Sequence, residues 1–191
     1  MKTVKIREAL CVGWNLFMQR PWYLLDLTLA TCGLFVAVGS KGVLVEALGS
    51  IIYAGYIACM LAYSRGESIQ FDDLFDIDKR WIYFAFLMVI KSFFILLGFI
   101  CFVVPGIYLT VRWMFAEILV IDQGMRPLEA LRASSALTAG NRGKLFLYSL
   151  TALLLIVVGF LFIIIGGITG MIVTMFATLH IYKELQKAQH I

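Results

Sequence analysis

Four ionisable side chains interrupt stretches of this sequence that are otherwise apolar: Asp26, Lys91, Arg112 and Glu117. The last two fall in PGIYLTVRWMFAEILVID, residues 105–122, which looks like part of a membrane-spanning helix. Charges inside such helices face the interior of a helix bundle, pair with one another or line a polar path. The chemistry open to these residues is therefore mutual neutralisation, or the passage of a polar cargo or ligand.

The spacing of these charges predicts which of them meet. The Pro105–Gly106 step reads as the tight turn of a helical hairpin. At 1.5 Å per residue, Lys91 and Glu117 lie about 21 Å and about 18 Å from that turn, so we expect an ion pair across the hairpin. Asp26 reaches a similar depth, about 22 Å before Lys41. A structural role for the pair and a place on a transport or ligand path both stay open.

Arg112 differs from the other three because it lies only about 10 Å from the same turn. Its long side chain either extends outward to the membrane surface or takes a partner from another hairpin. Asp26 and Arg112 are therefore further intramembrane polar candidates beside the Lys91–Glu117 pair.

The sequence contains no motif of a catalytic site. GxSxG, HExxH, GxGxxG and Walker sequences are absent, and His180 and His190 have no acidic or cysteine companions at ligand spacing. The four cysteines stand far apart: Cys11, Cys32, Cys59 and Cys101. One acidic segment lacks the spacing of a calcium loop: Glu67, Asp72, Asp73, Asp76 and Asp78. We expect no catalytic residue, no metal site, no cofactor and no enzymatic activity.

Composition indicates a membrane protein. Hydrophobic residues make up 62% of the 191 residues and charged residues 15%, with a mean hydropathy of +0.93. One crossing needs about 20 apolar residues. The apolar runs predict an all-α protein with six transmembrane helices in three hairpins, at residues 22–39, 43–63, 81–104, 106–121, 145–165 and 167–183. The expected short connections are residues 40–42, Pro105–Gly106 and Gly166–Gly167.

Basic residues predict the orientation of these helices. Thirteen of the 16 Lys and Arg residues flank the apolar runs on one side: Lys2, Lys5, Arg7, Arg20, Arg65, Lys79, Arg80, Arg126, Arg132, Arg142, Lys144, Lys183 and Lys187. By the positive-inside rule, this side is cytoplasmic, together with both termini and the connections at 64–80 and 122–144. Because these residues form no dense patch with interleaved aromatics, the net charge of +4 does not indicate nucleic acid as a partner.

The charged segments on the predicted cytoplasmic side repeat. The tripeptide EAL occurs at residues 8–10 and again at 129–131, each time before a predicted hairpin. We interpret residues 1–191 as a single integral membrane domain with an internal repeat, about 1–64 and 122–185.

Helices on the predicted cytoplasmic side accompany these hairpins. In the first of them Ile6, Leu10, Trp14 and Phe17 share one face, so the helix either lies in the membrane interface or packs beneath the bundle. Its counterpart at 127–140 is mostly Ala and Ser, which favours close helix packing.

PGIYLTVRWMFAEILVIDQG followed by PLEALRASSALTAGN resembles the shared core of a bacterial family of six-helix inner-membrane proteins of unknown function. That family is similar to the membrane domain of some glycerophosphoryl diester phosphodiesterases. GESIQFDDLF resembles the family's first long cytoplasmic loop, so the likeness covers nearly the whole chain. The resemblance implies a multi-pass protein of the bacterial inner membrane. The family usually has more basic and aromatic residues where this chain has Ala133, Ser134, Ser135 and Ala136, which argues against a strong basic anchor there.

The sequence thus predicts a non-catalytic inner-membrane protein that acts as a structural, regulatory or partner-binding component of the cell envelope. The alternative is a small transporter or a lipid-handling membrane protein. Membrane lipids are the expected partners, with another membrane or cytoplasmic protein as a further option, and the oligomeric state stays open. A polar cavity joining Asp26, Lys91, Arg112 and Glu117 would favour the alternative.

Overall fold

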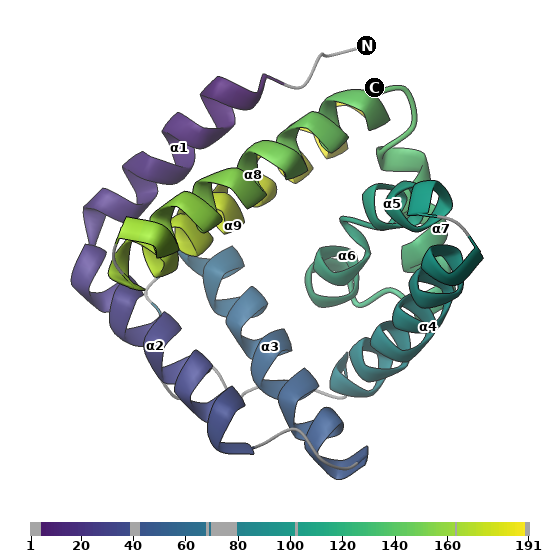
Figure 1. Ribbon diagram of the computed structural model, residues 1–191, viewed down its shortest axis with the longest axis horizontal. Coiled ribbons are helices and arrows are strands. Elements are labelled where there is room, and N and C mark those ends of the chain that lie inside the picture. The colour runs from purple at the N-terminus through teal and green to yellow at the C-terminus, as the bar shows by residue number, and fades with distance from the viewer. Residues whose placement is uncertain are drawn as a thin grey trace.

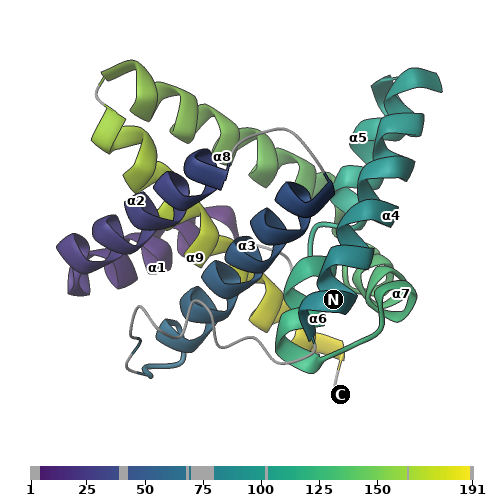
Figure 2. The same ribbon diagram turned by 90° about the horizontal axis from the view of Figure 1, so that it is seen from below.

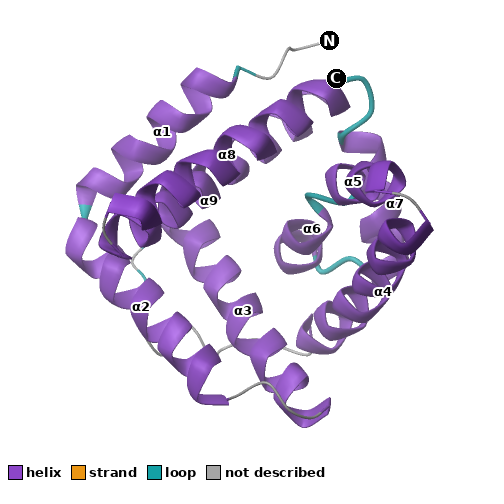
Figure 3. Ribbon diagram, viewed as in Figure 1, coloured by secondary structure: helices purple, strands orange, loops and turns teal. Residues whose placement is uncertain are grey.

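The computed structural model describes residues 5–38, 43–67, 69, 80–101, 103–162 and 164–189, and the regular elements within these ranges are all helices (Figure 3). They are α1 (Ile6–Gln19), α2 (Pro21–Val38), α3 (Val43–Tyr63), α4 (Arg80–Cys101), α5 (Val103–Arg112), α6 (Ala116–Gln123), α7 (Pro127–Leu137), α8 (Arg142–Phe162) and α9 (Ile164–Gln189). The all-α prediction is confirmed for these ranges. The expected turn at 40–42 and the acidic residues Asp72, Asp73, Asp76 and Asp78 lie outside them.

The helices form two groups that α3 connects. α9 packs most extensively against α1 and α8, and these three helices run along one side of the molecule in Figure 1. α4, α5, α6 and α7 make up the second group, and α3 contacts α2, α4, α6 and α9. In Figure 2 the α4–α5 and α8–α9 hairpins both close toward the top, whereas α6 and α7 lie toward the bottom.

Three stretches are long and apolar enough to cross a membrane: Ile82–Ile100, Val104–Gln123 and Arg142–Leu161. They correspond to α4, to α5 with α6, and to α8. Only 17% of the first stretch and 11% of the third are buried inside the protein. Ile100 and Leu161, for example, are largely exposed. Soluble proteins rarely expose apolar surface so continuously, whereas helices that face lipid do.

Two of the predicted turns are wrong. Pro105–Gly106 lies inside α5 and Gly166–Gly167 lies inside α9, so the hairpins close earlier, after Cys101 and after Phe162. Pro105 is compatible with helix because it occupies the first turn of α5, where backbone N–H groups have no acceptor within the helix. The small residues near each turn therefore belong to the arms of the hairpins.

Glycines on both arms let the arms of each hairpin approach closely. A Cβ added at Gly98 would lie 3.1 Å from Gly106 Cα, and one at Gly159 would lie 2.5 Å from Gly166 O. The ring of Phe99 covers Gly106, where a Cβ would meet it at 2.6 Å. Backbone thus packs directly on backbone in α4–α5 and α8–α9, an arrangement that small residues permit between membrane helices.

The predicted helix at 106–121 is also wrong as a single element. The chain leaves helical geometry after Arg112 and resumes it at Ala116, which separates α5 from α6. In this interruption the Ala116 N–H donates to Trp113 O, three residues back, at 3.2 Å. Residues 107–123 contain neither glycine nor proline, so the usual local causes of a helix break are missing from the sequence.

The first amphipathic helix, α1, packs against α9. α1 buries Ala9, Gly13 and Phe17, and α9 is its main neighbour. The contact is so close that a Cβ at Gly13 would lie 2.4 Å from Val173 O. Trp14 is half exposed, so part of the predicted apolar face stays outside this contact.

Replacing Gly159 with alanine should destabilise the folded protein by about 1–3 kcal/mol, because the new Cβ would overlap the backbone of α9. Gly33 in α2 provides the matched control, since a Cβ built there has nothing within 4 Å. Gly33→Ala should leave stability unchanged or raise it by up to about 1 kcal/mol. Thermal unfolding in detergent, followed by far-ultraviolet circular dichroism, measures both effects. Equal melting temperatures for the two variants would contradict the glycine packing.

Candidate functional site

Lys91 and Glu117 meet between α4 and α6. Lys91 Nζ lies 2.6 Å from Glu117 Oε1, and each side chain is 15% exposed. Tyr53 of α3 donates a hydrogen bond from its Oη to the other carboxylate oxygen, Glu117 Oε2, at 3.2 Å. We call Tyr53, Lys91 and Glu117 the Glu117 cluster. Its two opposite charges neutralise each other, and both carboxylate oxygens have a partner, as partly buried charges require.

The chain reaches this contact by a different route from the predicted one. Lys91 lies about 15 Å from the end of α4 at Cys101, whereas Glu117 would lie about 21 Å along a continuous helix that began at Val103. The interruption between α5 and α6 offsets this mismatch, because it redirects the chain and starts a new helix. Glu117 is in the first turn of α6, where the helix dipole also favours a carboxylate.

α7 supplies hydrogen bonds that the interruption requires. Ser134 Oγ donates to Arg112 O at 3.0 Å and accepts the Phe115 N–H at 3.2 Å. Thr138 Oγ1 lies 3.3 Å from the same Arg112 carbonyl, but its single proton has nearer acceptors in Ser134 O at 3.0 Å and Ser135 O at 3.2 Å. Ser134 and Thr138 are fully buried, so a backbone group left unpaired here would cost about 1–3 kcal/mol. These hydrogen bonds connect the Ala- and Ser-rich α7 to the interruption between α5 and α6. We call this contact the α7 joint.

Two arginines attach α7 to its neighbours. Arg112 takes its partner from α7, since its Nε donates to Ser135 Oγ at 2.7 Å. Arg142, at the start of α8, donates from Nη1 to Tyr108 Oη at 2.5 Å and from Nη2 to Ser135 O at 3.4 Å. Its guanidinium also lies 5.2 Å from the centre of the Tyr108 ring, within the range of a cation–π interaction. These contacts join α5, α7 and α8.

Asp26 does not join the other predicted residues. Its side chain is exposed on α2, and we find no ion pair or hydrogen bond between it and another described residue. Arg112 contacts α7 and stands apart from the Glu117 cluster. The structure therefore divides the four candidates among three places.

A second polar network, which sequence reasoning missed, ties together the ends of helices. Asp122, near the end of α6, pairs with Arg65 and accepts a hydrogen bond from Tyr182 Oη at 2.9 Å. Next to Tyr182, Lys183 Nζ donates to Ser64 O at 3.1 Å. The partners of Asp122 lie 57 and 60 residues away in the chain. From the sequence, only Asp122 could be recognised, as an acidic residue at the end of an apolar run.

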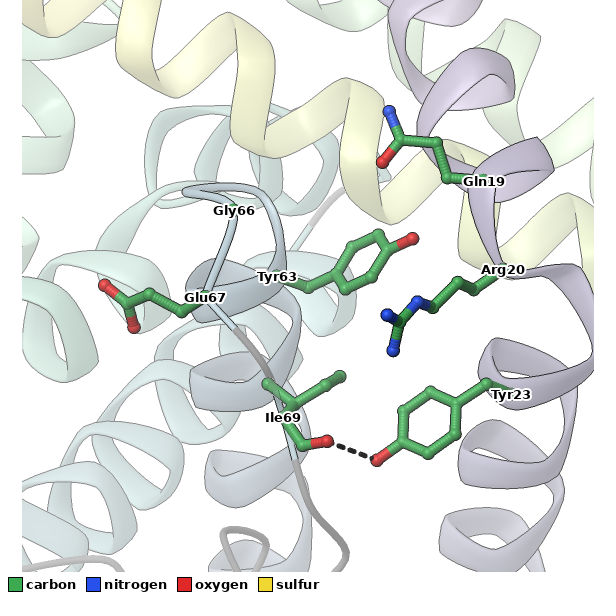
Figure 4. A pocket seen from close by; sticks show the side chains of 7 residues that line it. All are labelled: Gln19, Arg20, Tyr23, Tyr63, Gly66, Glu67 and Ile69. Atoms are coloured by element: carbon green, nitrogen blue, oxygen red, sulfur yellow. Dashed lines mark hydrogen bonds between the residues drawn. The ribbon is translucent and has the colours of Figure 1, made fainter.

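An open pocket lies at the corner between α1 and α2, with a cavity volume of about 240 Å³. Its wall includes Gln19, Arg20 and Tyr23 at the corner, and Tyr63, Gly66 and Ile69 at the end of α3 and beyond. Figure 4 shows the Arg20 side chain extending between the rings of Tyr63 and Tyr23. We call this the Arg20 pocket. In the sequence, Arg20 is recognisable only as one of the basic residues on the predicted cytoplasmic side.

Comparison of the chain with protein-family models, with curated proteins and with solved structures gives no match. The family resemblance therefore stays a prediction. Within the described residues, no group of three or more His, Cys, Asp or Glu side chains is placed to hold a metal ion.

Lys91→Met and Glu117→Leu should each lower the free energy of unfolding by about 3–5 kcal/mol, because each leaves a buried charge without its partner. The variant carrying both changes should lose less than either single variant, about 1–3 kcal/mol, because only the Tyr53 hydroxyl is then left without its acceptor. Glu117→Leu should be the more harmful single change, since Tyr53 also loses its acceptor. Melting temperatures in detergent give the comparison. Losses that simply add in the double variant would mean that the two charges are not coupled.

Proposed function

We propose that this chain is a multi-pass protein of a bacterial inner membrane that acts without catalysis as a structural, regulatory or partner-binding component. The exposed apolar surfaces of α4 and α8 support the membrane location. The bacterial inner membrane is the location that the family resemblance implies.

Six crossings with both termini in the cytoplasm form part of this proposal. Besides the three stretches of membrane length, α2, α3 and α9 contribute helices of 18, 21 and 26 residues. The α4–α5 and α8–α9 hairpins close on one side in Figure 2, and α6 and α7 lie toward the other. This arrangement supports short connections outside and basic segments in the cytoplasm.

The paired state of Lys91 and Glu117 is the observation that carries the proposal. A charged side chain on a transport path must exchange its partner for the cargo. In contrast, one oxygen of the Glu117 carboxylate is paired with Lys91, and the other accepts a hydrogen bond from Tyr53. Asp26 and Arg112 lie elsewhere, so these charges do not mark one path. Exposed side chains that a partner could contact, such as Trp14 of α1 and Leu128 of α7, lie instead on the predicted cytoplasmic side. The lipid-handling alternative retains one supporting observation, the Arg20 pocket.

Access of a water-soluble reagent to the Glu117 cluster tests this proposal. In a chain whose native cysteines have been replaced, Glu117→Cys is combined with Lys91→Met, so that neither charge remains unpaired. Glu129→Cys, on the exposed side of α7, serves as the control. A membrane-impermeant maleimide should label the control in inside-out vesicles but not in right-side-out vesicles.

The cysteine at position 117 should stay unlabelled in both kinds of vesicle, because a closed bundle admits no water-soluble reagent. Labelling there from either side would support a transport path instead. Labelling of the control from the outside would overturn the proposed orientation.

A further inference from the structure

We propose that the Arg20 pocket binds the phosphate of an anionic phospholipid headgroup, with the guanidinium of Arg20 as its main ligand. This inference rests on the proposed membrane location, since a lipid reaches the pocket only from an adjoining bilayer. It adds a ligand class and a binding residue to the proposed function.

Arg20 brings into the pocket a positive charge that forms no ion pair with a carboxylate of the described residues. Its side chain is exposed, and we find no ion pair or hydrogen bond between it and any other side chain of the described ranges. Glu67 is the carboxylate among the lining residues, and it points away from the guanidinium (Figure 4). A planar guanidinium with five N–H donors matches a phosphate, to which it donates two parallel hydrogen bonds.

The walls of the pocket are held by contacts that do not involve Arg20. Tyr23 Oη donates to Ile69 O at 2.8 Å, and Tyr63 Oη donates to Leu16 O at 3.3 Å. The Tyr63 ring also packs on Phe176 of α9, with 5.6 Å between ring centres. These contacts fix the chain after α3 against the α1–α2 corner, so the pocket is formed before a ligand arrives.

The first turn of α2 adds positive potential to the pocket. α2 begins at Pro21, directly after Arg20, and Tyr23 in its first turn belongs to the wall. The start of a helix carries a partial charge of about +0.5 and favours bound phosphate. α1 ends at Gln19 in the same wall, and the carbonyl end of its dipole offsets this potential, so the Arg20 guanidinium supplies the net positive charge.

The surroundings of the pocket favour a lipid over a soluble phosphate compound. Trp22, two residues after Arg20, is 80% exposed, and Met18, two residues before it, is 55% exposed. Exposed tryptophan beside a basic residue is typical of the membrane–water interface, where the indole lies at headgroup level. Pro21 and Tyr63 stand at the predicted cytoplasmic ends of the first two crossings. Basic pockets at this depth between helices bind anionic headgroups.

Native mass spectrometry of the full chain in detergent, titrated with phosphatidylglycerol, tests the inference. Arg20→Gln should weaken binding about tenfold or more, because it removes the charge-assisted hydrogen bonds. Arg20→Lys should lose less, since it retains the charge but not the paired donors. The matched control is Arg7→Gln, which removes an exposed arginine of α1 outside the pocket and should change binding less than about twofold.

Two further probes identify the source of the phosphate. Phosphatidylcholine with the same acyl chains should bind more weakly than phosphatidylglycerol, and inorganic phosphate at millimolar concentration should not compete.

Equal weakening of phosphatidylglycerol binding in Arg20→Gln and Arg7→Gln would overturn the assignment of the Arg20 pocket, because it would indicate diffuse charge attraction. Competition by inorganic phosphate would overturn the lipid assignment. A chain that needs no detergent to stay in solution would refute the proposed membrane function itself, whereas a membrane-inserted Arg20→Gln variant with unchanged lipid binding would refute this inference alone.

Discussion

The interruption between α5 and α6 is the constraint on which the rest of the arrangement depends. In apolar surroundings, a chain leaves helical geometry only where other groups replace the lost hydrogen bonds. Here the Ser134 hydroxyl donates to the Arg112 carbonyl and accepts the Phe115 N–H. Because Ser134 belongs to α7, the position of α7 and the path of the interrupted helix are determined together.

The same interruption places the charges of α6. This helix of 8 residues has Glu117 in its first turn, beside Lys91 and Tyr53. Near its other end, Asp122 pairs with Arg65 just beyond α3. One acid near each end of α6 thus holds neighbouring elements in place. Charges used in this way stabilise the packing of the helices. In the proposed function, a partner is therefore recognised by helices and pockets at the predicted cytoplasmic surface.

The sequence predicted most helices to within a few residues, because the length of an apolar run limits the length of its helix. The sequence misplaced two turns, because tight turns and closely packed helices both use small residues. The residue across the hairpin, such as Gly98 for Gly106, distinguishes a packed glycine from a turn glycine, and the sequence does not show that residue. Lys91 and Glu117 were visible because charges interrupt their apolar runs. The break in the helix was not, because its hydrogen bonds come from Ser134, which reads as an ordinary polar residue.

The α7 joint, in which the Ser134 hydroxyl bonds the backbone of the interruption between α5 and α6, is the central feature of this protein. The free energy of unfolding of Ser134→Ala, compared with Ser149→Ala, tests it most directly, because the Ser149 hydroxyl donates to Phe146 O within its own helix. We expect Ser134→Ala to lose about 1–3 kcal/mol, since the Phe115 N–H is left unpaired. The control should change by less than about 0.5 kcal/mol. Equal stability of the two variants would contradict the joint.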